Sequence, residues 1–267
     1  MLGLGNSIIS GVALDSGPFT PESISNIAIW LKSSTNVEAD SNSNGSTTYD
    51  PVRTVALGNI SDNDRISAWK AAGSTSINAA QTSGADKPRW DATEEEIKFP
   101  NNAKHMDLSA TTSISANTNF TIVIRFKTII TPAGHGLLGH SANEFLSVKD
   151  ADTIRFKSDG TNSEFDGDTM ATDKYQTLIV VRSDGATGNV NMFMRGTDSG
   201  YFDGTATGTA FGSEIQDNEQ IDISSLGSKK DTTAEYNGYI TDFILYNGTA
   251  VTAAQREQLY DYIEAAI

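Results

Sequence analysis

The chain has 267 residues, no cysteine and a formal net charge of −15, from 19 Lys and Arg against 34 Asp and Glu. The absence of cysteine excludes disulfide frameworks, thiolate metal centres and cysteine nucleophiles. The acidic charge argues against a nucleic-acid partner, and no segment has the roughly 20 apolar residues of a membrane helix, so we expect no membrane insertion.

Residues 1–22 are small, apolar and rich in Gly, Ser and Pro. The first cationic side chain is Lys32, so the positive region of a signal peptide is missing and we interpret the segment as a non-cleaved arm. Gly3, Gly5 and Gly11 would each cost about 1 kcal/mol in a helix, which favours an extended arm. The arm either folds back on its own domain or docks on another subunit through its apolar side chains, which are Leu2, Leu4, Ile8, Ile9, Val12 and Leu14.

Alternation of apolar side chains with a period of two predicts strands along most of the chain. The runs cover residues 27–32, 120–127, 154–157, 178–182, 190–195 and 239–246. Tight-turn signals punctuate them at Asn44-Gly45, Asp159-Gly160, Asp184-Gly185, Asp203-Gly204, Asn237-Gly238 and Asn247-Gly248. Strands at this spacing without intervening helices predict an all-β, antiparallel sandwich or barrel.

One helix is predicted, at the C-terminus. Thr252 and Gln255 have the spacing of a capping box, in which each side chain bonds the other residue's backbone N–H. Leu259, Ile263 and Ile267 then recur every four residues, so one stripe of this short helix can dock on the sandwich.

Ordered blocks along nearly the whole chain carry a family resemblance. The most specific runs from Asn237 to Asn247, a strand ending in Tyr-Asn, and precedes the capped helix. Earlier blocks cover residues 27–32, 66–70, 79–82, 87–90, 99–102, 106–108, 120–126, 137–140, 154–156 and 180–185. On these residues the chain resembles laminin-G-like, concanavalin A-type jelly rolls, in the version found in virion proteins of marine tailed bacteriophages. The resemblance implies a two-sheet β-sandwich over residues 23–267, with residues 1–22 as a docking arm.

The chain departs from that family in a polar insertion loop at residues 34–66, which is longer and more acidic than usual. It is a partner-contacting loop, an ion-binding loop or a solvated excursion. Asp40, Asn42 and Asn44 alternate before Gly45, as in the first half of a calcium loop, but Pro51 stands where a bidentate Glu is wanted. Calcium binding is therefore a hypothesis, and we expect no other cofactor.

We expect no enzyme, because no acidic pair has the geometry of glycoside hydrolysis. Glu214 and Glu219 are five residues apart and would face opposite ways on a strand, and the run at 94–96 is expected to face water. His135 and His140 would diverge for the same reason, so we interpret the histidines as isolated and hydrogen-bonded.

Glycan binding needs an exposed aromatic ring near convergent polar groups. Trp30 and Trp69 lie in strand patterns and are expected in the core. Trp90, Tyr201 and Phe202 lie beside loop signals and are the candidates for stacking on a sugar.

The sequence and its resemblance together predict a non-enzymatic virion structural protein of a tailed phage. It would be displayed on the particle surface, as a head decoration in preference to a tail component, and be anchored by its arm. The expected partners are capsid or tail subunits, and other copies of the chain in a homo-oligomer. The alternative is a glycan-binding receptor module that recognises host surface polysaccharide.

Overall fold

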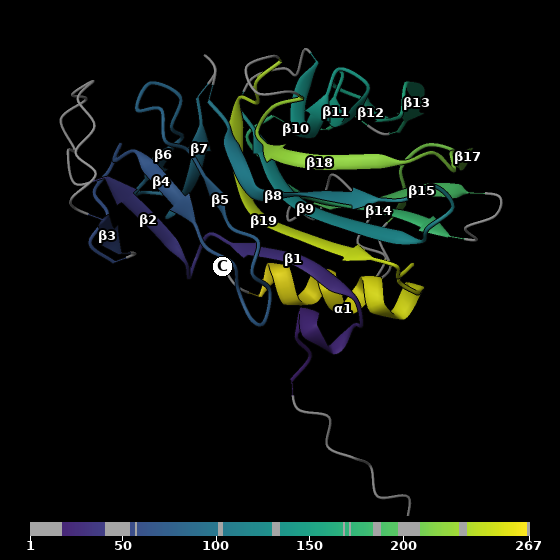
Figure 1. Ribbon diagram of the computed structural model, residues 1–267, viewed down its shortest axis with the longest axis horizontal. Coiled ribbons are helices and arrows are strands. Elements are labelled where there is room, and N and C mark those ends of the chain that lie inside the picture. The colour runs from purple at the N-terminus through teal and green to yellow at the C-terminus, as the bar shows by residue number, and fades with distance from the viewer. Residues whose placement is uncertain are drawn as a thin grey trace, which may run out of the picture.

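A computed structural model describes residues 18–40, 54–56, 58–100, 104–129, 134–167, 169–170, 172–183, 188–196, 209–229 and 234–265. Two antiparallel sheets pack face to face, and one helix lies outside them, below β1 and β19 in Figure 1. The predicted all-β, two-sheet sandwich with a short C-terminal helix is confirmed.

The first sheet has nine strands. Their order is β16-β15-β14-β9-β19-β7-β6, with β1 paired to β19 and β17 paired to β15. The strands are β1 (Ile27–Lys32), β6 (Arg89–Asp91), β7 (Glu96–Phe99), β9 (Phe120–Thr128), β14 (Tyr175–Ser183), β15 (Asn189–Gly196), β16 (Thr209–Ala210), β17 (Ile215–Gln216) and β19 (Gly238–Asn247).

The second sheet has ten strands in the order β13-β12-β11-β10-β18-β8-β5-β4-β2-β3. They are β2 (Val37–Asp40), β3 (Thr54–Ala56), β4 (Ile66–Trp69), β5 (Ala79–Ala80), β8 (Met106–Ile114), β10 (His135–Ser141), β11 (Glu144–Val148), β12 (Thr153–Ser158), β13 (Thr161–Asp166) and β18 (Ile221–Leu226). Because β2 and β3 lie within residues 34–66, the prediction of one continuous insertion loop there is wrong for these strands. Val37 and Ala39 are buried, so β2 belongs to the core.

The helices are a short 3-10 turn, η1 (Pro21–Ser23), and α1 (Ala253–Glu264). The predicted capping box of α1 is confirmed, since Thr252 Oγ1 accepts from the N–H of Gln255 at 3.3 Å and Gln255 Oε1 accepts from the N–H of Thr252 at 2.9 Å. Leu259 and Ile263 face the sheet and are buried. Among the described residues, no helix has the length and apolar character needed to cross a membrane.

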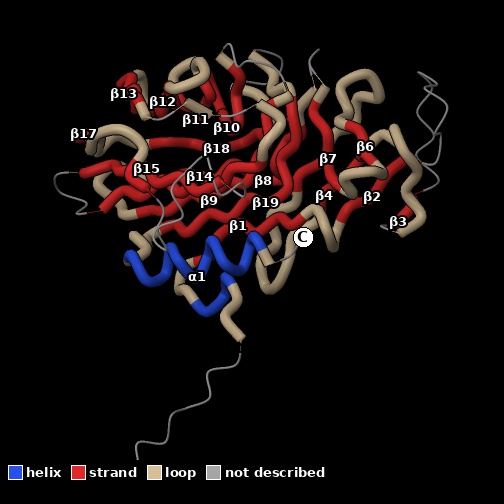
Figure 2. The backbone as a smooth tube through the Cα atoms, turned by 180° about the vertical axis from the view of Figure 1, so that it is seen from behind, coloured by secondary structure: helices blue, strands red, loops and turns tan. Residues whose placement is uncertain are grey.

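Alternating side chains on the central strands enter two separate cores. On β9, Ile122 and Ile124 lie between the sheets, whereas Val123 lies on the outer face beneath α1. Ile179 of β14 and Ile244 of β19 join Val123 there. Figure 2 shows α1 lying alongside this sheet, next to β1. The outer face of the first sheet is therefore covered over part of its area, because the helix supplies the apolar stripe that these residues require.

Two of the predicted turns have the backbone that a tight reversal requires. Asp159 and Gly160 have φ of 34° and 89° and join β12 to β13, and Gly248 has φ of 103° after β19. Gly238 instead begins β19, where an added Cβ would lie 2.0 Å from the carbonyl oxygen of Lys127. Glycine is needed there for close strand approach, so the prediction of a turn at 237–238 is wrong. The pairs at 44–45, 184–185 and 203–204 lie outside the described residues.

The end of the predicted arm packs on the domain. The Phe19 ring lies edge-on to that of Tyr262, with centroids 6.3 Å apart, and Tyr246 Oη donates to the carbonyl oxygen of Pro21 at 3.0 Å. Residues 18–22 therefore belong with the sandwich. The six apolar residues predicted to dock lie outside the described residues.

Candidate functional site

A pocket of about 410 Å³ opens on the outer face of the first sheet, beside the C-terminal end of α1. The helix end is close, since Lys32 Nζ lies 4.9 Å from the centre of the Tyr262 ring. The pocket is lined by Lys32, Ser33, Ser34, Gly58, Ile60, Trp90, Ala92, Glu94, Glu95, Glu96, Arg125, Thr241 and Asp242. Its volume falls within the range of roughly 300–1,000 Å³ that is typical of small-ligand sites.

A β-bulge in β19 places the carboxyl group of Asp242 in the lining of the pocket. Pairing with β9 runs from Ile240 opposite Phe126 directly to Asp242 opposite Arg125, so one extra residue, Thr241, stands in β19. After the bulge, Phe243 faces the inter-sheet core, as Ile240 does before it. Bulges re-aim side chains in this way. The bulge therefore places Asp242 on the outer face of the sheet, away from the inter-sheet core.

The bulge completes a row of polar side chains across four strands. Asp242 pairs with Lys32 of β1 on one side and with Arg125 of β9 on the other, and Arg125 pairs with Thr177 of β14. Residues directly opposite one another in neighbouring strands interact through their side chains. The row therefore brings cations and an anion from distant parts of the sequence to one place.

Three charged side chains of the pocket are nearly inaccessible to water. Arg125 is 2% exposed, Asp242 4% and Glu96 8%. Arg125 Nη1 lies 3.8 Å from Glu96 Oε1, and Thr241 donates to Asp242 Oδ2 at 3.1 Å. The remaining atoms, Arg125 Nε and Nη2, Glu96 Oε2 and Asp242 Oδ1, have no hydrogen-bond partner among the described residues. Buried polar groups of this kind are expected to have a partner, whether protein, water or ligand.

Burial also changes the ionisation of these groups. It raises the pKa of Glu96 to about 8, although the charges of Arg125 and Lys127 oppose the shift. It raises the pKa of Asp242 to about 6, against the charges of Arg125 and Lys32 and the hydrogen bond from Thr241. At neutral pH the pocket therefore holds a mainly protonated Glu96 beside a mainly ionised Asp242.

The rim of the pocket is the hairpin between β6 and β7. Asp91 Oδ1 accepts from the N–H groups of Thr93 at 3.1 Å and Glu94 at 3.2 Å, which closes the turn. Glu95 follows with φ of 57°, and Glu96 then begins β7 opposite Asp91. Short polar side chains that bond the backbone two or three residues ahead are typical of such turns.

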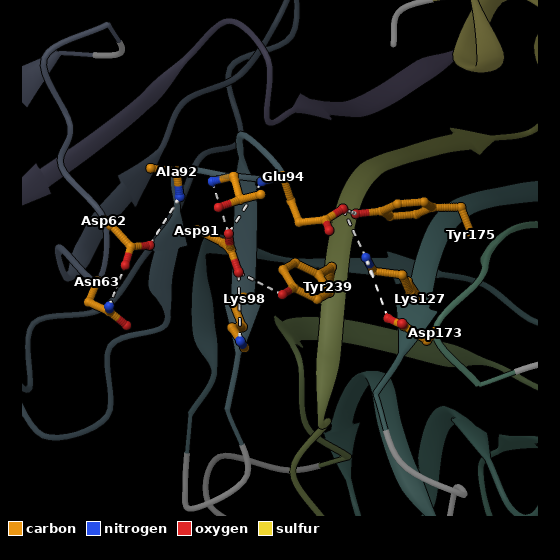
Figure 3. A network of polar contacts seen from close by, with 11 residues as sticks. Asp62, Asn63, Asp91, Ala92, Glu94, Lys98, Lys127, Asp173, Tyr175 and Tyr239 are labelled. Atoms are coloured by element: carbon orange, nitrogen blue, oxygen red, sulfur yellow. Dashed lines mark hydrogen bonds and ion pairs between the residues drawn. The ribbon is translucent and has the colours of Figure 1, made fainter.

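A network of polar contacts holds this rim against the sheet (Figure 3). Glu94 lies 2.9 Å from Lys127 Nζ and accepts from Tyr175 Oη at 3.2 Å. Tyr239 Oη donates to Asp91 Oδ2 at 2.7 Å. Burial alone would raise the pKa of Asp91, but hydrogen bonds from Tyr239 and the turn N–H groups, with the charge of Lys98, bring that pKa below its usual value. The rim is thus fixed without a ligand, as preorganised recognition requires.

The expectation that the 94–96 run faces water is confirmed for Glu94 and Glu95, which are exposed, and wrong for Glu96, which is buried. Neither Arg125 nor Asp242 was predicted from the sequence. The signal that could have identified them is a charged side chain within a strongly apolar strand, since Ile-Arg-Phe and Thr-Asp-Phe stand at the centres of β9 and β19. Charged residues in such surroundings are paired or functional.

The predicted core tryptophans are confirmed, because Trp30 and Trp69 are both buried. Trp90 was expected to be exposed for stacking on a sugar. It is instead 5% exposed and belongs to the inter-sheet core, so that expectation of an exposed ring is corrected. Trp90 stands at the centre of β6 between two half-buried residues, and it also lines the pocket on the outer face. Tyr201 and Phe202 lie outside the described residues.

Of the predicted calcium ligands, Asp40 ends β2 and lies 2.5 Å from Lys87 Nζ. Asn42 and Asn44 lie outside the described residues, so calcium binding there stays a prediction. A different group, His140, Glu144 and Asp222, has possible ligand atoms within 4.8 Å of one another. His140 Nδ1 lies 3.0 Å from Ser224 Oγ, and both Glu144 oxygens accept hydrogen bonds, from Ser141 and from the N–H of Asp222. All three side chains are half-buried, and the group gives no independent indication of an ion.

No known family model matches the sequence, and no curated protein matches it. Among solved structures, a mutant of Trypanosoma rangeli sialidase with trans-sialidase activity has a TM-score of 0.50 at 13% identity, covering 93% of this chain and 35% of the sialidase. This chain thus spans about a third of the sialidases it matches. Domain 4 of AbnA, a GH43 arabinanase from Geobacillus stearothermophilus solved with arabinotriose, has a TM-score of 0.44 at 14% identity, covering 88% of this chain and 98% of that domain. The likeness to the sialidase shows the β-sandwich fold.

Proposed function

We propose that this protein is a glycan-binding module and that the pocket on the outer face of the first sheet is its binding site. One observation carries the proposal. Arg125, Asp242 and Glu96 line the pocket, are nearly fully buried, and keep four hydrogen-bonding atoms without a partner among the described residues. Leaving such atoms unpaired costs free energy that a ligand can recover.

A sugar suits this set of groups. Each hydroxyl donates one hydrogen bond and accepts others, so it can serve a guanidinium and a carboxylate at once. The rim at residues 92–95 is fixed by the Asp91 turn and the Lys127 contacts, which limits the entropy lost on binding. Pockets with a few convergent polar groups are the usual sites for small ligands.

A role in binding is favoured over hydrolysis. Glu96 and Asp242 do pair one raised pKa of about 8 with another of about 6, as an acid and a base would. One oxygen of each, however, is already engaged, that of Glu96 by Arg125 and that of Asp242 by Thr241. We infer that they orient a ligand. Release of reducing sugar from any bound glycan by the purified protein would assign a hydrolase instead.

The test is a glycan array followed by calorimetric titration of the strongest binder at pH 7.5. Arg125→Met removes the free N–H groups while keeping an unbranched side chain, and should weaken binding roughly tenfold or more. Arg155→Met is the matched control, because Arg155 lies on the second sheet and pairs with Glu164. Equal affinity of the wild type and Arg125→Met would rule out the pocket as the site.

We further propose, from the sequence resemblance, that this module is displayed on a phage virion, with capsid or tail subunits and further copies of the chain as its partners. The position of the described end of the arm supports this proposal. Phe19 and Pro21 are held against Tyr262 and Tyr246, on the side of the sandwich that carries α1.

A further inference from the structure

The charge of Arg125 is already compensated by a protein group. Asp242, which is mainly ionised at neutral pH, is its direct neighbour across the strands. A ligand carboxylate would add another anion to this guanidinium. It would also meet the other acids that line the pocket rim, Glu94 and Glu95, within a chain of net charge −15. The site is therefore unfavourable for an acidic sugar.

An ammonium group on the ligand is also unfavourable, because it would meet the cations of the pocket. Lys32 and Arg125 both line the pocket, and burying a further cation between them is costly unless it gains an anion of its own. Of the two rim acids that could supply one, Glu94 already binds Lys127 and Tyr175, and Glu95 is exposed, so that water and salt screen its charge. The site is therefore unfavourable for an amino sugar as well.

The four pocket atoms without a hydrogen-bond partner among the described residues, two donors and two carboxyl oxygens, can all be satisfied by neutral hydroxyl groups. Arg125 Nε and Nη2 lie on one edge of the planar guanidinium and donate side by side. Asp242 Oδ1 is a free acceptor in the neighbouring strand, and Glu96 Oε2 is free beside it. Two adjacent hydroxyls can accept from Arg125 and donate to Asp242. A hydroxyl also satisfies Glu96 in either protonation state, because it can accept as well as donate.

We propose that the pocket selects an uncharged sugar unit, two adjacent hydroxyls of which bridge Arg125 to Asp242. The inference rests on the proposed glycan-binding function and specifies its ligand class. The Arg125 guanidinium lies over the Tyr175 ring, with Cζ 4.2 Å from the ring centre. That contact holds the donating edge in place while the ligand binds.

The experiment compares neutral, uronic-acid and glucosamine-containing glycans on one array, with calorimetry of the best neutral glycan and its carboxylated counterpart at pH 7.5. The affinity for the neutral glycan is expected to exceed that for the carboxylated one by a factor of roughly ten or more. Asp242→Asn, which keeps the side-chain shape, should weaken the neutral glycan roughly tenfold. Arg155→Gln should leave its affinity unchanged, and melting curves confirm that each variant is folded.

The outcomes separate the two proposals. Preference for a carboxylated or amine-bearing glycan, lost in Arg125→Met, would overturn the selectivity and leave the binding function standing. Unchanged affinity in Asp242→Asn would overturn the bridging geometry. If no glycan binds at millimolar concentration, both proposals are overturned.

Discussion

Glu96 shows how burial changes what a carboxyl group does. It stands next to two exposed acids in a Glu-Glu-Glu run, yet β-strand alternation turns it onto the sheet beside Arg125. Desolvation raises its pKa to about 8 in the folded protein, from about 4.5. The folded state therefore retains a proton that the unfolded chain releases, and stability depends on pH.

Glu96→Gln should make this dependence visible. The stabilising contribution of the protonated Glu96 is complete below pH 4.5 and is lost as the pH rises to about 8. Gln cannot ionise, so the variant should melt close to the wild type at low pH and a few °C above it near pH 8.5. Calorimetric melting at several pH values measures the difference.

The matched control is Glu95→Gln, one residue away on the exposed turn. Its melting temperature should follow the wild type at every pH. A Glu96→Gln variant whose offset from the wild type stays constant with pH would show that Glu96 is already ionised in the folded protein.

At the scale of elements, α1 and the bulge in β19 divide the outer face of the first sheet. The helix covers Val123, Ile179 and Ile244, and the pocket begins where the helix ends. The bulge then presents Asp242 on that uncovered area. The helix end lies next to the site, since the ring of Tyr262 is close to Lys32.

Thr252→Ala should weaken the anchoring of α1. It removes the oxygen that accepts from the N–H of Gln255, a loss of about 1 kcal/mol for an N-cap. For a chain of this size the melting temperature should fall by about 2–4 °C. Gln258→Ala, on the exposed side of the same helix, is the control and should change it little. If Thr252→Ala and Gln258→Ala changed the melting temperature equally, the cap would contribute nothing measurable to stability.

At the scale of the whole molecule, the described end of the arm, residues 18–22, packs on the sandwich. Deleting residues 1–17 should leave the melting temperature within about 1 °C, whereas extending the deletion through Pro21 should lower it, because the packing on Tyr262 and the bond from Tyr246 are lost. If the virion role holds, the shorter deletion should also remove the protein from purified particles, as measured by mass spectrometry. Particles that retain it would contradict arm docking.

Much of the fold could be predicted from local patterns. The six alternating runs are strands, and the Thr252–Gln255 box begins the helix, because period-two alternation and capping depend on near neighbours. β2 and β3 were missed because both are short and lie in polar surroundings, where pairing partners determine the structure.

The sequence by itself determined the all-β class, the helix and its cap, and the acidic charge, since each follows from composition or from residues close together in the chain. The pocket was decided by tertiary structure alone. Lys32, Glu96, Arg125 and Asp242 come from four strands far apart in sequence, and sheet pairing brings them together. A one-residue bulge sets the face on which Asp242 lies, and burial then shifts its pKa. These effects depend on which strands pair and on what covers the sheet, so no local pattern encodes them.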